Sequence, residues 1–177
     1  MRQMGRSSDS GLVYGVSVFR QENLEQAVYT GIALAVEDSV YHDVMIDESL
    51  LDELERNGAK FNRDAVQFVT RDKTGQIVWL ESGNSSAGLE HILHGNGRTP
   101  GHAGDFARAF GVSESEVASY LRSVIAHGEV VSNELKPIGS SGRMGYERVY
   151  YYEGNYHVVT GIGTNGFIVS AFPRRKK

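Results

Sequence analysis

The sequence predicts an α+β protein in which helices come first and an antiparallel sheet follows. Before residue 128 most apolar residues recur at helical spacing, whereas the chain after it consists mostly of β-rich runs. Those runs are joined by short turn sequences, Gly154-Asn155 and Thr164-Asn165-Gly166, which are typical of antiparallel hairpins. Runs of helices followed by runs of strands indicate α+β architecture. We therefore expect N-terminal helices followed by a four- to five-stranded antiparallel sheet.

Residues 1–62 are expected to form an N-terminal, mainly helical segment. Apolar and other residues alternate in 12–20, which predicts a strand, and apolar residues recur at helical spacing in 22–36. A second helix is expected at 47–56, with Asp47 as its N-cap. None of these elements carries an obvious chemical group, and we assign this segment no role.

Residues 63–177 carry clearer signals and are expected to form one domain. A polar, glycine-containing turn lies between β-rich runs at 65–70 and 76–80, which predicts a hairpin. Ser113 and Glu116 are three residues apart, a capping box that predicts the start of a helix. The other expected elements are helices at 85–93, 105–110 and 113–126 and strands at 129–135, 146–153, 156–161 and 167–172.

Composition and charge narrow the classes of protein to consider. The chain has 177 residues and no cysteine, which excludes a disulfide framework and a thiolate metal site. No apolar run approaches the roughly 20 residues of a membrane span, and the polar N-terminus has no signal-peptide core, so we expect no membrane contact. Residues 1–81 hold 8 Lys+Arg and 14 Asp+Glu, a net charge of −6, whereas residues 82–177 hold 10 and 8, a net charge of +2. This asymmetry indicates an anionic partner for the second half, the alternative being a basic tail that aids solubility.

Three of the six histidines, His91, His94 and His102, fall close together in the sequence. An imidazole gives and takes protons near neutral pH. Cleavage of RNA by its own 2′-hydroxyl needs a base, an acid and a group that stabilises the charged phosphorane, and it demands no metal or other cofactor. The alternatives are half-buried packing histidines, or a metal site that combines all three with Asp105. The familiar helical zinc spacing is missing from the sequence.

Complementary groups lie near the end of the chain. Thr160 and Ser170 are hydroxyl residues in expected strands, and strand alternation puts Ser170 on the same face as Ile168 and Phe172. Lys136 ends an expected strand, where it can reach a phosphate, and Arg143 lies in a glycine-rich loop that can approach an anion.

One expected strand has an aromatic face that includes a cation. Aromatic side chains interleaved with arginine suit the stacking of unpaired bases, and packing in the core or at an interface is the alternative for the tyrosines. The residues on this face are Tyr146, Arg148, Tyr150 and Tyr152.

Two segments resemble a known nuclease family. The stretch 77–93 is similar to the start of the phage- and toxin-associated branch of the barnase–EndoU–colicin–RelE (BECR) superfamily, with a strand, a Gly-Asn turn and a helix carrying Gly-Leu-x-His-Ile. The stretch 158–173 resembles the last hairpin of that family, where a Ser or Thr precedes an aromatic residue by two positions and a Pro follows. The resemblance leaves the first 60 or so residues unaccounted for.

The resemblance implies a metal-independent endoribonuclease, often specific for tRNA, that leaves a 2′,3′-cyclic phosphate. By position, His91 matches the helical histidine, Ser170 the hydroxyl residue and Phe172 the aromatic residue, which is usually Tyr in the family. Such domains commonly form the warheads of bacterial toxins or occur in phage and mobile-element proteins. The resemblance therefore implies RNA and an acidic immunity protein as partners, and a cytoplasmic site of action after delivery within a secreted or phage-borne protein.

The leading hypothesis is an endoribonuclease with His91 as general base or acid and with Ser170, Lys136 and Thr160 in the catalytic site. The residues expected to contact the substrate are His94, His102, Arg143, Arg148 and Phe172. One alternative is a catalytically degenerate interaction module, favoured by Phe172 and by the acidic first half. A second is a metal-dependent hydrolase that uses His91, His94 and His102.

Overall fold

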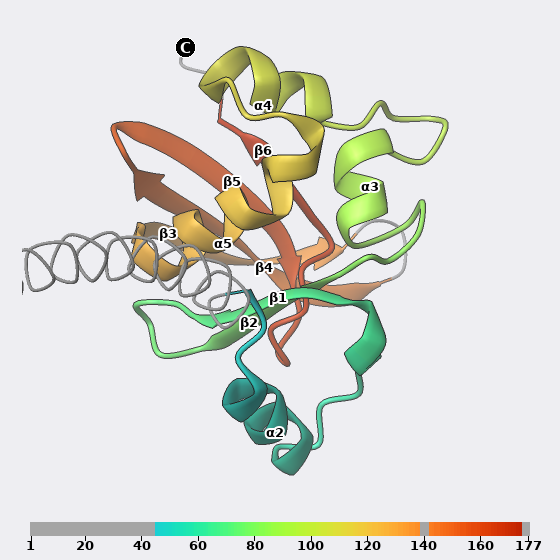
Figure 1. Ribbon diagram of the computed structural model, residues 1–177, viewed down its shortest axis with the longest axis vertical. Helices are drawn as coiled ribbons and strands as arrows, with labels where there is room; N and C mark the ends of the chain where they lie inside the picture. The colour runs from blue at the N-terminus through green and yellow to red at the C-terminus, as the bar shows by residue number, and fades with distance from the viewer. Residues whose placement is uncertain (1–44, 139–141, 175–177) are drawn as a thin grey trace, which may run out of the picture. The chain divides into compact units, whose positions relative to one another are not determined.

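Helices precede an antiparallel sheet in the computed structural model, which describes residues 45–138 and 142–174 (Figure 1). The strand expected at 12–20 and the helix expected at 22–36 lie outside the described residues. The coarse α+β prediction is confirmed, with one two-stranded and one four-stranded sheet, both antiparallel, in the described part of the chain.

The first described helix, α2 (Glu48–Arg56), begins where the sequence predicts. The Asp47 side chain caps it by accepting hydrogen bonds from the backbone N–H groups of Ser49 and Leu50. The helix is amphipathic and buries Leu51 and Leu54.

A short 3₁₀ turn, η1 (Arg63–Ala65), leads into the hairpin of β1 (Val66–Arg71) and β2 (Ile77–Glu81). The Asp72 side chain organises the hairpin turn by accepting hydrogen bonds from the backbone N–H groups of Thr74, at 2.9 Å, and Gln76, at 3.3 Å. The hairpin expected from the sequence is therefore confirmed.

The middle of the chain is helical. α3 (Leu89–His94) begins later than expected, because residues 84–87 form a turn instead of a helical start. The capping box is confirmed, with the Ser113 backbone N–H donating to Glu116 Oε2 at 2.9 Å. The elements that follow α3 are α4 (Ala103–Phe110), η2 (Glu114–Glu116) and α5 (Val117–His127).

The C-terminal sheet has the strand order β3-β4-β5-β6, so each strand pairs with its neighbour in the sequence. Its strands are β3 (Glu129–Ile138), β4 (Arg143–Tyr152), β5 (Asn155–Ile162) and β6 (Ser170–Pro173). The last strand starts at Ser170 rather than at residue 167. The preceding residues pair with the hairpin instead: Trp79 N–H donates to Gly166 O, and Ile168 N–H donates to Trp79 O. This parallel pairing joins the two sheets.

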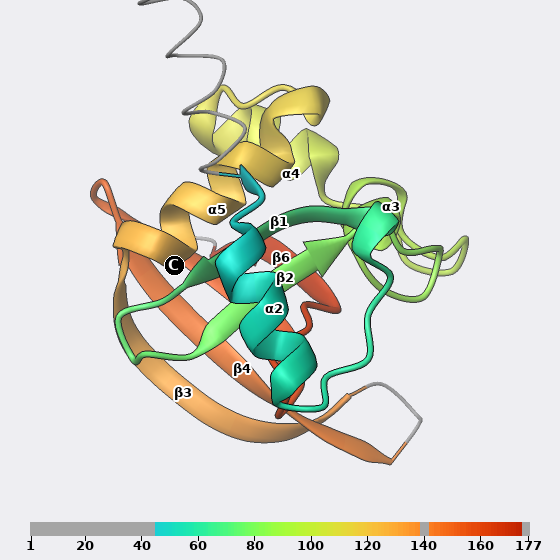
Figure 2. The same cartoon turned by 60° about the horizontal axis from the view of Figure 1, so that its bottom comes forward.

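The hairpin is covered on both faces. One face joins the main core, in which Phe68 and Leu80 pack with α5 and with residues of the C-terminal sheet such as Tyr150 and Val159. On the other face, α2 packs against Val66, Val69 and Trp79 (Figure 2). Residues 45–62 therefore share a core with the hairpin and belong to the same compact unit, Asp43–Lys177, rather than to a separate segment.

Candidate functional site

A pocket of about 1090 Å³ lies against the face of the C-terminal sheet that points away from α5. Its lining comes from the loop before α3, from α3 itself, from β3 to β6 and from the turn between β5 and β6. Five residues predicted from the sequence line it together: His91, Lys136, Arg143, Thr160 and Ser170. Residues that are distant in the sequence therefore meet in one concave site, which is the usual geometry of a substrate site.

His91 is held in a defined orientation at this pocket. Its ring Nδ1 lies 2.9 Å from the carbonyl oxygen of Ser85. Because a carbonyl only accepts hydrogen bonds, Nδ1 must carry the proton, and Nε2 is then the ring nitrogen with the lone pair that can accept a proton. The backbone N–H of Gly88, directly before α3, donates to Val169 O at 3.0 Å and ties this helix to the segment that leads into Ser170.

Glycine is required in the loop that precedes α3. Gly88 has φ 86° and ψ −165°, a region that only glycine adopts readily. A Cβ atom there would also lie 2.8 Å from the Glu81 carbonyl oxygen. The close approach lets the loop fold back on β2, so that Ser85 can hold the His91 ring. This gives a physical reason for the Gly-Leu-x-His spacing noted in the sequence.

Thr160 and Ser170 supply hydroxyl groups on adjacent strands. They are directly opposite each other in the pairing of β5 with β6, so their side chains lie on the same face of the sheet. Ser170 is 8% exposed and Thr160 more so. Two neighbouring hydroxyls at the floor of a pocket can donate hydrogen bonds to an anionic group.

A carboxylate that the sequence reasoning missed, Glu147, also lines the pocket. Its Oε1 accepts a hydrogen bond from Lys136 Nζ at 2.7 Å, and Glu134 holds the same ammonium group at 3.0 Å. The hydrogen bond to Glu147 and the weaker effect of the one to Glu134 raise the pKa of Lys136, which therefore stays charged. Strand alternation would have found Glu147, since it lies between Tyr146 and Arg148 and must point to the opposite face.

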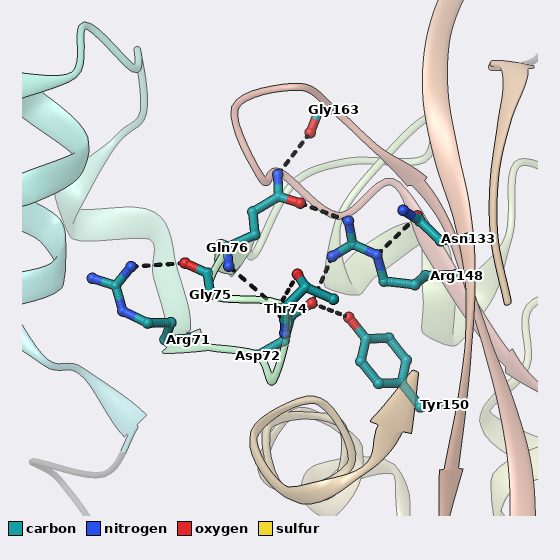
Figure 3. A network of polar contacts seen from close by, with 9 residues as sticks. All are labelled: Arg71, Asp72, Thr74, Gly75, Gln76, Asn133, Arg148, Tyr150 and Gly163. Carbon is teal, nitrogen blue, oxygen red and sulfur yellow. Dashed lines mark hydrogen bonds and ion pairs between the residues drawn. The ribbon is translucent and has the colours of Figure 1, made fainter. Parts of the chain in front are cut away.

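Arg148 does not line the pocket, which corrects the prediction that it contacts the substrate. Only 3% of the residue is exposed, because it points into the interior between the hairpin turn and the sheet (Figure 3). Its guanidinium donates to Asp72 Oδ2 at 2.6 Å, to Gln76 Oε1 at 2.7 Å and to Asn133 Oδ1 at 3.0 Å. It clamps the hairpin turn to the C-terminal sheet.

The aromatic face of β4 is likewise a packing face. The Tyr150 hydroxyl donates to Asp72 Oδ2 at 2.9 Å, and its ring is fully buried. Burial, with the Asp72 carboxylate beside it, raises the pKa of the Tyr150 phenol. Tyr146 and Tyr152 pack partly buried against the same core. The core alternative is therefore confirmed for these tyrosines, and this face is closed to bases.

The remaining predicted residues lie outside the pocket lining. His94 Nε2 lies 3.8 Å from Glu90 and 3.6 Å from Glu114. His102 Nδ1 lies 3.0 Å from Asp105, and the rings of His102 and Phe172 are 5.1 Å apart. The hydrogen bond from His102 lowers the pKa of the Asp105 carboxyl.

The ligand set required by the metal hypothesis does not assemble. In the part of the chain that the structure describes, no three His, Asp or Glu side chains are placed to hold a metal ion. His91, His94 and His102 each have a different partner: a carbonyl, two glutamates and an aspartate.

Comparison with known proteins assigns no family to this chain. No protein-family model matches it, and no curated protein matches it either. Among the described residues, no helix has the length and apolar character needed to cross a membrane. The function must therefore be inferred from the chemistry of the pocket.

Proposed function

We propose that this chain is a metal-independent endoribonuclease of the BECR type that cleaves RNA by attack of its own 2′-hydroxyl. The observation that carries the proposal is the convergence of His91, Glu147, Lys136, Thr160 and Ser170 on one pocket. Imidazole, carboxylate, ammonium and hydroxyl groups can supply the base, the acid and the charge stabilisation that this reaction requires.

The reaction needs two proton transfers. As the 2′-oxygen bonds to phosphorus, its proton passes to a base, and as the bond from phosphorus to the 5′-oxygen breaks, an acid protonates that oxygen. His91 Nε2 serves one role and Glu147 the other, since both line the pocket. The products are a 2′,3′-cyclic phosphate and a free 5′-hydroxyl, so atoms and charge balance without an outside reactant.

The other groups stabilise the phosphorane. Ser170 and Thr160 donate hydrogen bonds to the non-bridging oxygens, which carry the growing negative charge. Lys136 contributes a permanent positive charge at the pocket, although two glutamates already pair with it. Arg143, at the start of β4, adds a second cation to the lining.

The degenerate-module alternative loses part of its support. Phe172 replaces the usual tyrosine of the family, but the Phe172 side chain does not line the pocket and lies beside His102 instead. The missing phenol therefore removes no group from the pocket itself.

Incubation of the protein with total RNA in EDTA tests the proposal. The wild type should produce fragments with cyclic-phosphate ends, and His91→Ala should reduce the rate by about 10²- to 10⁴-fold, the usual contribution of a general acid or base. His94→Ala is the matched control, since it removes an exposed imidazole of the same helix that does not line the pocket. Absence of cleavage by the wild type, or equal cleavage by wild type and His91→Ala, would refute the proposal.

The biological setting follows from the same proposal. A ribonuclease of this type acts on cytoplasmic RNA, with tRNA as the first substrate to test, and its producer needs an acidic immunity protein. Induced expression should then arrest growth, and His91→Ala should relieve the arrest. Arrest that persists in His91→Ala would show that growth inhibition does not come from this pocket.

A further inference from the structure

A pair of exposed tyrosines lies on the C-terminal sheet outside the pocket. Tyr151 on β4 and Tyr156 on β5 are directly paired, with ring centroids 5.0 Å apart. They are 41% and 42% exposed, unlike the buried Tyr150 of the opposite face. The Arg174 guanidinium lies over the Tyr156 ring, 6.0 Å from its centroid.

These tyrosines and the pocket hydroxyls share one side of the sheet. Tyr156 and Thr160 are four residues apart on β5, so their side chains point the same way and lie roughly 14 Å apart along the strand. Between them lie Val149 and Val158, which are paired with each other and buried. These two valines therefore lie on the same side of the sheet, between the pocket hydroxyls and the two aromatic rings.

The charge beside the two tyrosines suits an anion. A groove of about 540 Å³ beside Tyr156 is lined by Arg108, Arg174 and Asp105. Arg108 pairs with Asp105 at 2.7 Å, and their charges cancel. The net positive charge of the three groups is therefore that of Arg174. Aromatic rings next to a cation are the combination that binds single-stranded nucleic acid: bases stack on the rings, and the phosphate meets the cation.

We propose that Tyr151, Tyr156 and Arg174 form a subsite for an unpaired nucleotide beyond the two that flank the scissile bond, and that this subsite selects single-stranded RNA. The inference rests on the proposed ribonuclease function. A base must leave its stack to lie on a tyrosine ring, and duplex RNA holds its bases inside the helix. The pocket performs the cleavage, and the tyrosine subsite determines which RNA reaches it.

The test compares a dinucleoside monophosphate, which fills the pocket alone, with a single-stranded oligonucleotide that reaches the tyrosines. In the Tyr151→Ala/Tyr156→Ala double variant, the ratio of kcat/KM for the oligonucleotide to that for the dinucleotide should fall about tenfold, mainly through KM, as expected for the loss of base stacking. Tyr151→Phe/Tyr156→Phe should keep the wild-type ratio, since the rings remain. Val131→Ala, an exposed β3 residue outside both pockets, is the control.

Two further measurements test the subsite, one with an Arg174 variant and one with a double-stranded substrate. Arg174→Gln, near the chain end, should also lower the ratio and weaken its dependence on salt. The wild type should cleave the oligonucleotide faster than the same strand annealed to its complement, and the double alanine variant should lose that preference. A wild-type ratio in the double alanine variant, or equal cleavage of single and double strands by the wild type, overturns the inference.

Failure of the proposed function is distinguishable from failure of the subsite. If the wild type cleaves neither substrate, the ribonuclease proposal fails, and binding of a non-cleavable 2′-O-methyl oligonucleotide decides the subsite by fluorescence anisotropy. Affinity about tenfold weaker in the double alanine variant supports the subsite. Equal affinity in wild type and variant rejects it.

Discussion

Both faces of the C-terminal sheet carry cationic and aromatic side chains. Those on the inner face are buried and stabilise the fold, whereas those on the outer face are exposed to solvent. On the inner face, Arg148 and Tyr150 are buried and bind the Asp72 carboxylate. On the outer face, Lys136 and Tyr151 contact solvent, and the core does not depend on them. A charged or aromatic residue in a strand therefore indicates function only once its face is known.

The largest effect should follow from breaking the inner-face ion pair. Arg148→Met leaves the Asp72 carboxylate buried without its cation, which should lower the free energy of unfolding by about 3–5 kcal/mol. Urea denaturation measures the change. Lys136→Met removes an exposed cation of the outer face and should have little effect on stability. Similar losses in the two variants would contradict the contrast between the faces.

The next effect concerns catalysis rather than stability. Glu147→Gln should reduce the rate of RNA cleavage by about 10²-fold or more, because it removes one of the two proton-transfer groups. Glu134→Gln is the matched control, since Glu134 also pairs with Lys136 but does not line the pocket. Equal rates in the two variants would mean that Glu147 acts only by pairing with Lys136. Thermal unfolding should show both variants folded.

A smaller effect is expected in the loop that orients His91. Gly88→Ala forces a Cβ against the Glu81 carbonyl and should cost about 1–3 kcal/mol through backbone strain, as well as displacing Ser85 from the His91 ring. Gly97→Ala is the control, since its φ is also positive but no atom lies within 4 Å of the added Cβ. Unfolding and cleavage assays of both variants separate the steric contact from the general cost of positive φ.

The smallest effect should come from the inner-face histidine, His157. Burial lowers its pKa, and its Nε2 lies 2.8 Å from the Tyr120 hydroxyl. The unfolded chain therefore binds a proton near pH 6.5 more readily than the folded chain does. The stability that the neutral, buried ring of His157 provides is fully present above about pH 6.5. It is lost as the pH falls towards the pKa that His157 has in the folded state. His157→Gln should flatten that part of the stability profile, and an unchanged profile would contradict the prediction.

Local sequence signals predicted most of the elements. The capping box of Ser113 and Glu116 and the hairpin turn around Asp72 act within a few residues, so they could be recognised without tertiary structure. Five of the nine proposed site residues lie in one pocket. His91 and Ser170 were predicted from the two ends of a resemblance, Lys136 and Thr160 from their strand positions, and Arg143 from its glycine-rich loop.

Long-range partners account for what the sequence did not predict. Arg148 looked like a surface cation because its partner, Asp72, lies 76 residues away. Glu147 is the exception, since strand alternation alone places it on the face opposite Arg148. The last strand was expected from residue 167, but the chain from Gly166 to Ile168 pairs with Trp79 on the other sheet. No pattern within a short window carries this information.

Because Trp79 pairs with the segment before β6, its intrinsic fluorescence can report on the structure around the pocket. Trp79 is the single tryptophan of the sequence, is 1% exposed, and lies at the junction of the two sheets. Its ring centroid is 5.8 Å from that of Phe167, which lines the pocket. Intrinsic fluorescence should therefore shift to longer wavelength when the sheets separate and respond more weakly when a ligand presses on Phe167. One chromophore would follow both unfolding and occupation of the pocket.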